Sequence, residues 1–415
     1  MAMVIKRDYY LQQLISSKSN NLIKIVTGIR RSGKSFLLFH LFHNHLIETG
    51  VSEDHIIEIA LDDRLNKNLR DPDVILQHIH ERIVDDKLYY IILDEVQMID
   101  EFTDVLNSLL HIRNADVYVT GSNSKFLSKD VVTEFRGRGD EIHLFPLSFA
   151  ELYNSIGGDK FELWKSYYTY GGLPGILELD SEKKKAAYLR SLHETVYLKD
   201  IIERNNLKNS EEFMELMRVM ASCIGSPCNP SKLENTFKSV KNETLDRKTI
   251  SKYLSYMEDA FLIEKSMRYD IKGRKYIGTL SKYYFQDIGL RNALLNFRQV
   301  EENHIMENVI YNELRLRGFC VDVGMVEART AKERKQLEVD FVANMADRRY
   351  YIQSAFAMPD DDKREQESAS LKRIDDSFKK IIIMRDDIKP YHDNNGFYMV
   401  GLMDFLLKPD LIEQL

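Results

Sequence analysis

A glycine-rich octapeptide near the amino end constrains the fold of this chain more than any other feature. Residues 28–35 have the sequence GIRRSGKS; the mostly apolar run Leu22–Thr27 precedes them, and the amphipathic stretch Ser35–Ile47 follows. Glycines permit a tight turn whose backbone N–H groups can surround a phosphate, and the amino end of a helix adds positive potential there. The pattern predicts a strand, a phosphate-binding loop and a helix, the opening of a parallel α/β sheet.

The chemistry of this loop points to ATP and Mg²⁺ as its ligands. We expect Lys34 to neutralise the β- and γ-phosphates and the Ser35 hydroxyl to ligate Mg²⁺. Further nucleotide contacts are assigned to the rest of the turn and the first helical residues, namely Gly28, Arg30, Arg31, Ser32, Gly33 and Phe36. The alternative is a glycine-rich turn without a ligand, which the flanking strand and helix make the weaker interpretation.

A second motif, sixty residues downstream, ends a strand with two acids. Tyr89–Leu93 is apolar without alternation, which is typical of a central strand covered on both faces, and Asp94 and Glu95 follow it. Adjacent carboxylates in such a place repel each other unless a cation lies between them. We therefore expect Asp94 to hold Mg²⁺ and Glu95 to polarise the attacking water. The alternative is that both carboxylates only cap the following helix.

Polar and basic residues after the next strand are further candidates for the site. The run Val117–Thr120 leads into GSNS, where Asn123, with Ser122 as second choice, is predicted to reach the γ-phosphate or its water. An ordinary polar turn is the alternative. Arg138, then Arg136, is the candidate to supply positive charge to a phosphate, within the chain or across the boundary of a homo-oligomer. Exposed arginines are, however, usually only solvated.

The pattern of apolar runs divides the 415 residues into four parts. Short apolar runs alternate with helical patterns up to residue 145, helical patterns follow Pro146, and three helices then precede the strand pair Tyr276–Leu280 and Lys282–Gln286. The predicted fold class is α/β: a parallel-sheet ATPase core (1–146), a helical lid segment (147–205), a winged helix-turn-helix (206–298) and a second α/β domain (299–415). The strands predicted for the core are Leu22–Thr27, His55–Leu61, Tyr89–Leu93, Val117–Thr120 and Glu141–Phe145.

Cysteine usage and hydropathy indicate a cytoplasmic protein. Cys223, Cys228 and Cys320 are too few for a disulfide framework and lack the accompanying His and Cys residues of a zinc site. No apolar run approaches 18 residues, and the amino end turns polar before a signal-peptide core could form. We therefore expect no membrane association.

The ordered set of motifs resembles the prokaryotic AAA-like ATPases that carry a C-terminal domain of unknown function. The matching stretches, which span roughly Ile5 to Met403, are TGIRRSGKS, YYIILDEVQ, VTGSNS, FRGRG, PLSFAEL, YGGLPG, YLKDII and the late pair EVDFVA and YIQSA. The resemblance implies an ATP-binding AAA-type core, a winged-helix middle and a C-terminal fold similar to restriction endonucleases.

The carboxyl-terminal segment departs from the requirements of a nuclease of that fold. Such a site needs an acid followed by a strand that bears Glu-x-Lys; Glu307 and Asp340 match the acids, but the next strand offers Gln353 and Ala355. A neutral amide is a poor ligand for Mg²⁺, and alanine supplies no cation. The replacement cation is sought at Lys335, Lys363 and Arg364. The sequence predicts a nuclease-like fold without nuclease activity.

A basic segment leaves the wider role of the chain open. Residues 231–282 contain twelve Lys and Arg against seven Asp and Glu, in a chain whose net charge is −7. A local positive balance on a winged helix is the pattern expected for nucleic acid, although winged helices also serve as protein-interaction modules. One interpretation is a slow ATPase that acts as a nucleotide-driven switch on double-stranded DNA. The other is a nucleotide-gated protein-interaction or remodelling module without DNA.

Overall fold

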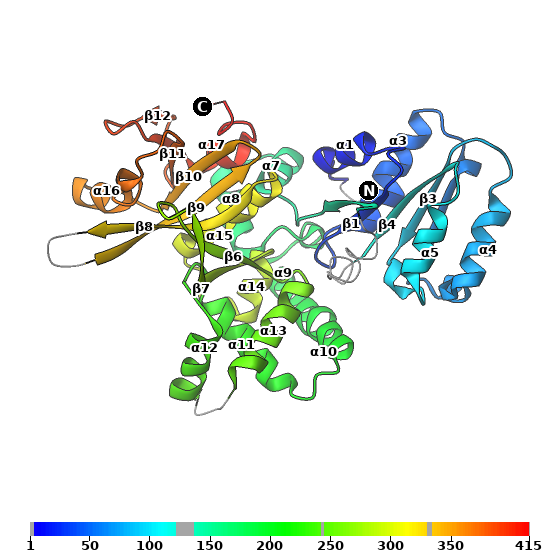
Figure 1. Ribbon diagram of the computed structural model, residues 1–415, viewed down its shortest axis with the longest axis horizontal. Helices are drawn as coiled ribbons and strands as arrows, with labels where there is room; N and C mark the ends of the chain where they lie inside the picture. The colour runs from blue at the N-terminus through cyan, green and yellow to red at the C-terminus, as the bar shows by residue number, and fades with distance from the viewer. Residues whose placement is uncertain (1–3, 122–136, 242–244, 330–333, 415) are drawn as a thin grey trace. The chain divides into compact units, whose positions relative to one another are not determined.

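The chain folds into two compact units. A computed structural model describes residues 4–121, 137–241, 245–329 and 334–414 (Figure 1). The amino-terminal unit comprises Met1–Leu147 with two short later segments, Leu173–Glu178 and Asp259–Phe261. The carboxyl-terminal unit comprises Ser148–Gly172, Leu179–Glu258 and Leu262–Leu415. The first unit ends close to the boundary predicted after residue 146.

The amino-terminal unit contains a five-stranded parallel sheet in the order β2-β3-β4-β1-β5. Its strands are β1 (Ile23–Thr27), β2 (Ile56–Ala60), β3 (Tyr89–Asp94), β4 (Ala115–Thr120) and β5 (Gly139–His143). Its helices include α1 (Asp8–Ser16), the continuous run α2 (Lys34–Phe36), η1 (Leu37–Phe42) and α3 (His43–Glu48), then α4 (Pro72–Arg82) and α5 (Phe102–Leu109). Each predicted core strand lies within two residues of an observed one, which confirms the parallel-sheet core.

Helices cover both faces of this sheet, because its central strands are apolar on both sides. Ile91 and Leu93 of β3 pack with α4 and α5, whereas Tyr90 and Ile92 pack on the other face with α1 and α3 (Figure 1). Helix α4 begins where the Asp71 carboxylate accepts the first free N–H groups, with a proline at the first helical position. The layers place the carboxyl ends of β1, β3 and β4 at one edge of the sheet.

The carboxyl-terminal unit surrounds a mixed eight-stranded sheet in the order β12-β13-β11-β10-β9-β8-β6-β7. Its strands are β6 (Ile263–Asp270), β7 (Lys275–Phe285), β8 (Cys320–Arg329), β9 (Arg334–Met345), β10 (Arg348–Ala355), β11 (Lys379–Met384), β12 (Tyr391–His392) and β13 (Tyr398–Gly401). The main helices are α7 (Phe149–Ile156), α8 (Lys160–Tyr170), α9 (Glu182–Leu192), α10 (Lys199–Asn205), α11 (Ser210–Ser222), α12 (Pro230–Thr236), α13 (Arg247–Asp259), α14 (Ile288–Leu294), α15 (Glu302–Leu316), α16 (Asp361–Ser368) and α17 (Leu402–Leu407). Helix α15 packs on one face of the sheet.

The strand pair predicted as the wing of a winged helix differs from the observed hairpin. Residues 275–285 form one continuous strand, β7, and its partner is β6 rather than a second piece of the same segment. Strand β6 also pairs with β8 in parallel, and the Ile271 side chain at the turn is buried in the core of the unit. The hairpin therefore belongs to the carboxyl-terminal sheet, and the boundary predicted at 298/299 falls between strands of one sheet. The winged-helix assignment stays a prediction.

Candidate nucleotide-binding site

The loop between β1 and α2 requires both of its glycines. Gly28 has a φ of 138°, and a Cβ atom there would lie 2.2 Å from the Leu144 carbonyl oxygen. Gly33 has a φ of 98°, in the left-handed region. A side chain at Gly28 would collide with the backbone that follows β5, and one at Gly33 would strain the loop, so the loop has this shape only with glycine. Arg31 adopts a φ of 65° between them.

Lys34 lies inside this loop as a buried cation that hydrogen-bonds backbone carbonyl groups. Its Nζ donates to the carbonyl oxygens of Gly28 at 3.0 Å and Ile29 at 3.2 Å. Burial lowers the pKa of Lys34 to about 8, although the nearby carboxylates of Asp94 and Glu95 oppose that shift. An anionic phosphate in the loop would favour the charged form and remove much of this desolvation cost.

The metal-ligand candidates, Ser35 and Asp94, are brought together at the carboxyl end of β3. The Ser35 hydroxyl hydrogen-bonds the Asp94 carboxylate, which also accepts from the hydroxyl of Thr120. Burial is the largest influence and raises the pKa of Asp94; the hydrogen bonds from Thr120 and Ser35 oppose it, and the charges of Glu95 and Asp62 add to it. A carboxylate whose charge is disfavoured by burial and by other acids is stabilised by a cation, so the donor set fits Mg²⁺.

Glu95 follows in a left-handed backbone conformation, with a φ of 53°. The amide of Gln97 donates to its Oε2 atom, and its own N–H donates to Thr120 Oγ1 at 2.9 Å. A non-glycine residue in this region is uncommon, and such conformations cluster at functional sites. The geometry positions a carboxylate beside the metal-ligand candidates, where it can orient a water molecule.

The remaining predicted loop residues have different environments. Ser32 is buried, and its Oγ has no hydrogen-bond partner among the residues that the structure describes. A buried hydroxyl of this kind suits a ligand in the loop. Arg30 is half-buried and Arg31 is exposed. Phe36 is 37% exposed, with its ring 4.9 Å from that of His40.

Arg138 lies at the amino ends of the strands, whereas the phosphate loop lies at their carboxyl ends. Gly139 pairs with Ile23, and the Ile23 N–H donates to the Arg138 carbonyl at 2.9 Å. These contacts are at the amino end of β1, whereas the loop follows its carboxyl end, about 16 Å away for five strand residues. The predicted role in cis is therefore wrong, and a role across a subunit boundary stays a prediction. Asn123, Ser122 and Arg136 lie outside the described residues.

Two residues of this site were not predicted, Thr120 and Arg7. Thr120 is the last residue of β4 and joins Asp94 to the backbone of Glu95; its place at the end of the strand beside β3 was the signal that could have found it. Arg7 is 4% exposed and donates to the carbonyls of Ser32 at 3.2 Å and Phe145 at 2.7 Å. Nothing in the local sequence marks Arg7, because its partners are 25 and 138 residues away.

The carboxyl-terminal unit also contains a buried lysine beside carboxylates. Lys282 of β7 is 2% exposed, and its Nζ lies 2.8 Å from carboxylate oxygens of both Glu307 and Glu338 and 3.6 Å from Asp340. The Tyr284 hydroxyl also donates to Glu307 at 2.8 Å. The predicted acids thus do meet a cation, but it comes from the hairpin strand β7.

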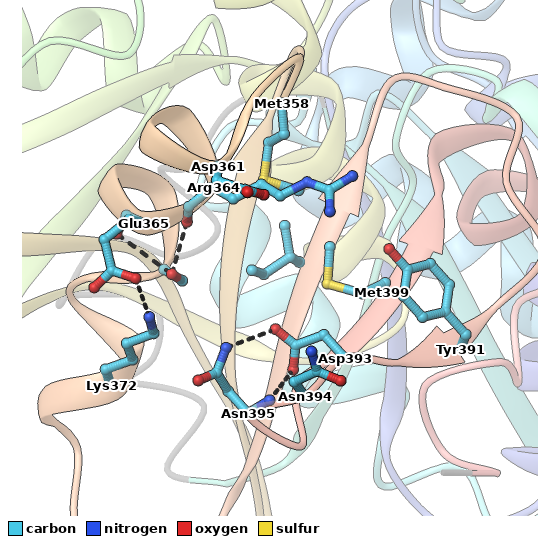
Figure 2. A pocket seen from close by; sticks show the side chains of 12 residues that line it. Met358, Asp361, Arg364, Glu365, Lys372, Tyr391, Asp393, Asn394, Asn395 and Met399 are labelled. Atoms are coloured by element: carbon cyan, nitrogen blue, oxygen red, sulfur yellow. Dashed lines mark hydrogen bonds and ion pairs between the residues drawn. The ribbon is translucent and has the colours of Figure 1, made fainter.

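The cations predicted for this position lie elsewhere. Lys363 forms an ion pair with Glu367 at 2.6 Å, and Lys335 is exposed on β9. Arg364 lines a separate pocket of about 270 Å³, together with Tyr391 and Met399 (Figure 2). All three predictions are wrong, because the space between the carboxylates is filled by a side chain that is remote in sequence.

Lys282 and the three carboxylates around it, Glu307, Glu338 and Asp340, are called the lysine cluster below. Burial and the crowding of acids set the pKa values in this cluster. Burial, then the charge of Glu307, raises the pKa of Asp340 to about 7. Burial alone would lower the pKa of Lys282, but Glu307, Asp340 and Glu338 outweigh it and raise that pKa. The Oε1 atom of Gln353 is buried without a hydrogen-bond partner within the described ranges. Among the same residues, no three His, Cys, Asp or Glu side chains are grouped so as to hold a metal ion.

The basic residues of the segment 231–282 lie on helix α12 and the following stretch Phe237–Lys241, on helix α13 and on the β6–β7 hairpin. Lys248 and Lys252 are exposed on α13. Lys272 and Arg274 lie at the hairpin turn, where they line a groove. Arg268 instead donates to the Met325 sulfur on β8.

The comparisons with known proteins agree with this architecture. Residues 20–153 match the family described as AAA domain, and residues 161–301 match a domain of unknown function, DUF8612. An uncharacterized protein of Haemophilus influenzae is 33% identical over 414 residues, with 98% of this chain and 99% of the relative covered. An uncharacterized protein of Methanocaldococcus jannaschii is 30% identical, with 99% and 90% covered.

Two solved structures illustrate the more distant likenesses. The Orc1 protein of Aeropyrum pernix in complex with DNA is 12% identical, covers 71% of this chain and 93% of its own, and gives a TM-score of 0.30. Hsp104 of Saccharomyces cerevisiae, in complex with casein, is 13% identical, covers 66% and 58%, and gives 0.34. No helix in the described part of the chain is long and apolar enough to cross a membrane. Through its full-length relatives and its matched domains, the chain belongs to the prokaryotic family of AAA-domain ATPases that carry a domain of unknown function.

Proposed function

We propose that the amino-terminal unit binds MgATP, hydrolyses it slowly and uses the cycle as a switch. The observation that carries this proposal is the contact of Ser35 and Asp94 beside the buried ammonium of Lys34. Two hydrogen-bonded oxygen donors and an adjacent cation inside a glycine loop match the chemistry of a magnesium–triphosphate complex.

Each residue has a distinct task in this proposal. Lys34 binds the phosphates, Ser35 and Asp94 hold Mg²⁺, and Glu95 orients and polarises the attacking water. Mg²⁺, when bound, neutralises the negative charge that develops on the phosphates. Thr120 fixes Asp94 and Glu95 relative to each other, and Arg7 holds the loop at Ser32.

Slow turnover and a homo-oligomer are linked in this proposal through Arg138. Arg138 lies at the amino ends of the strands, opposite the phosphate loop, so within a single chain it cannot contribute positive charge at the phosphates. A neighbouring chain could supply it, and such an arginine accelerates phosphoryl transfer strongly. Turnover per chain should then rise with protein concentration, and Arg138→Ala should remove the rise while ATP affinity holds. A loss independent of concentration would contradict the role across a boundary.

The test separates binding from hydrolysis with two variants. Lys34→Ala should weaken MgATP binding at least about 100-fold, because the cation that binds the phosphates is removed. Glu95→Gln should keep ATP affinity within about threefold and lose at least about 100-fold in turnover. Glu101→Gln, at an exposed carboxylate before α5, is the matched control. Unchanged turnover in both site variants would contradict the proposal.

We further propose that the switch acts on DNA, with double-stranded DNA as the first candidate. The support is the positive balance of residues 231–282, including exposed Lys248 and Lys252 on α13. Retention on duplex DNA that weakens steeply with salt would support this role. No retention at low salt would favour the second candidate, a nucleotide-gated protein-interaction or remodelling module.

A further inference from the structure

A groove of about 560 Å³ lies beside the turn of the β6–β7 hairpin, in the carboxyl-terminal unit. We call it the hairpin groove. Its lining includes Tyr269, Ile271, Lys272, Arg274, Arg349 and Phe378. The floor is apolar, because Ile271 and Ile374 belong to the buried core of the unit. The walls combine two aromatic rings with three cations, and neither the ATPase site nor the lysine cluster uses any of them.

The hairpin turn holds its basic residues in a fixed position. Asp270 accepts the Gly273 N–H at 2.9 Å, and the Ile271 N–H donates to the Met325 carbonyl at 3.0 Å. A Cβ at Gly273 would lie 2.2 Å from the Asp270 carboxylate. Arg274 adopts a φ of 50°. Lys272 and Arg274 are therefore presented by an anchored turn rather than by a free loop.

Arg349 is oriented by its neighbours before any ligand arrives. Its guanidinium carbon lies 5.1 Å from the ring centroid of Phe378 and 5.5 Å from that of Tyr269. Its Nε donates to Asn344 at 2.7 Å, and it also hydrogen-bonds the hydroxyls of Tyr351 and Tyr269. A planar cation fixed in this way has lost most of its rotational freedom already, which reduces the entropic cost of binding a ligand.

The acids of the groove do not cancel its cations. Asp376 accepts from the Tyr351 hydroxyl at 2.6 Å and from the Phe378 N–H at 3.2 Å. The Asp375 side chain is 85% exposed and 3.5 Å from Lys272, a solvated pair of small energy. Two of the three cations, Arg274 and Arg349, therefore face no carboxylate in an ion pair among the residues that the structure describes. The surplus of charge favours an anionic ligand.

We propose that the hairpin groove binds single-stranded nucleic acid, with phosphates at Lys272 and Arg274 and a base at the aromatic wall. Cations along a groove combined with aromatic faces are the combination that binds unpaired strands. An apolar floor suits a base that has left its stack, which a duplex does not offer. The site shares no residue with the nucleotide site or with the exposed lysines of α13, although Lys272 and Arg274 belong to the basic segment 231–282 that supports the duplex proposal.

The experiment measures binding of a fluorescent oligothymidylate of about 20 nucleotides to the full chain, by fluorescence anisotropy at several salt concentrations. The double variant Lys272→Glu with Arg274→Glu should bind at least about tenfold more weakly. Its slope of log affinity against log salt should fall by about 1.4, which is about 0.7 for each of the two phosphates that the variant no longer neutralises on a single strand. Lys248→Glu with Lys252→Glu makes the same charge change on α13 and should bind within about twofold of the wild type.

The role of the bases is tested with an abasic strand of equal length and with Phe378→Ala. The abasic strand should bind about tenfold more weakly, and Phe378→Ala should weaken only the strand that has bases, as expected when stacking contributes. Unchanged melting temperatures and MgATP affinities would show that the variants fold. The proposal is overturned if the wild type does not bind, if both double variants lose equally, or if the abasic strand binds as well as the intact one.

Discussion

Lys34 of the amino-terminal unit and Lys282 of the carboxyl-terminal unit are both buried beside carboxylates, yet their pKa values shift in opposite directions. Lys34 donates to backbone carbonyls, and burial lowers its pKa to about 8. Lys282 contacts Glu307 and Glu338 at 2.8 Å, and the surrounding acids raise its pKa. Both ammonium groups are desolvated to a similar degree, so the opposite pKa shifts come from how close the neighbouring carboxylates lie.

This difference separates a site that needs a ligand from one that is complete. Around Lys34 the carboxylates of Asp94 and Glu95 oppose the effect of burial without outweighing it, which leaves the ammonium to be stabilised by phosphate. Around Lys282 the protein itself supplies the anions, and the lysine occupies the space among them. We therefore expect Lys34 to control binding and Lys282 to control stability.

The largest effect on stability is expected from Lys282→Met, which nearly keeps the length of the side chain and removes its charge. Removing one partner of a buried ion pair leaves uncompensated acids, so the free energy of unfolding should fall by about 3–5 kcal/mol. Urea denaturation of the full chain, followed with a probe of the carboxyl-terminal unit, measures the change. Lys335→Met, at an exposed site on β9, should change it by less than about 0.5 kcal/mol. A fall smaller than about 1 kcal/mol would mean that Lys282 does not stabilise the three carboxylates through buried ion pairs.

A smaller effect is expected from Arg7→Ala, at a residue that acts on ATP through the loop. The Ser32 and Phe145 carbonyls lose a buried donor, so MgATP affinity should fall about tenfold, in line with one or two missing hydrogen bonds. Turnover at saturating ATP should fall less than affinity, because Arg7 does not touch the reacting groups. Arg7→Lys should recover part of the affinity, and Lys6→Ala, at an exposed position, should leave it unchanged. An equal fall in turnover and affinity would argue against a positioning role.

A still smaller effect concerns pH and Asp340. Its folded pKa of about 7 is above the ordinary value, so its contribution to stability is present at low pH and is lost as pH rises through about 7. Between pH 6 and 7 the unfolding free energy of the carboxyl-terminal unit should fall by about 1 kcal/mol more in the wild type than in Asp340→Asn. Parallel pH profiles for the two proteins would show that Asp340 ionises as in the unfolded chain.

No measurable effect is expected in a nuclease assay. Lys282 already neutralises the carboxylates, and Gln353 supplies only a neutral amide, so Mg²⁺ or Mn²⁺ gains little at this cluster. Plasmid and oligonucleotide substrates should remain intact with either metal, in the wild type and in Asp340→Ala. Metal-dependent cutting that disappears in Asp340→Ala would reverse the assignment, whereas cutting that persists in the variant would indicate a contaminant.

The core fold and most of its site could be predicted because their signals are local. The apolar run before Gly28 and the run before Asp94 each fix a strand and the residue at its end, and parallel pairing then brings the ends together. Strand β8 was not predicted, since Gly324 and scattered polar residues interrupt its pattern. The structure supplies the reason for the glycine: a Cβ there would lie 2.8 Å from the Val339 side chain of the neighbouring strand.

Contacts between distant segments could not be predicted. Lys282 precedes Glu338 and Asp340 by more than fifty residues, and no spacing rule relates β7 to β9 before the sheet order is known. Arg7 is an isolated arginine in a polar amino-terminal stretch. Arg138 is a different case: it directly precedes β5, and parallel pairing with β1 places it at the amino ends of the strands, which the predicted strand Glu141–Phe145 already implied.

The central claim is that the buried lysines Lys34 and Lys282 have different functions, and one matched pair of substitutions tests it most directly. Calorimetric titration with MgATP should show one binding site of wild-type affinity, within about twofold, in Lys282→Met. Lys34→Met, the same chemical change in the phosphate loop, should bind at least about 100-fold more weakly, a loss of about 2.7 kcal/mol. Wild-type binding by Lys34→Met, or equal losses in both variants, would contradict the account.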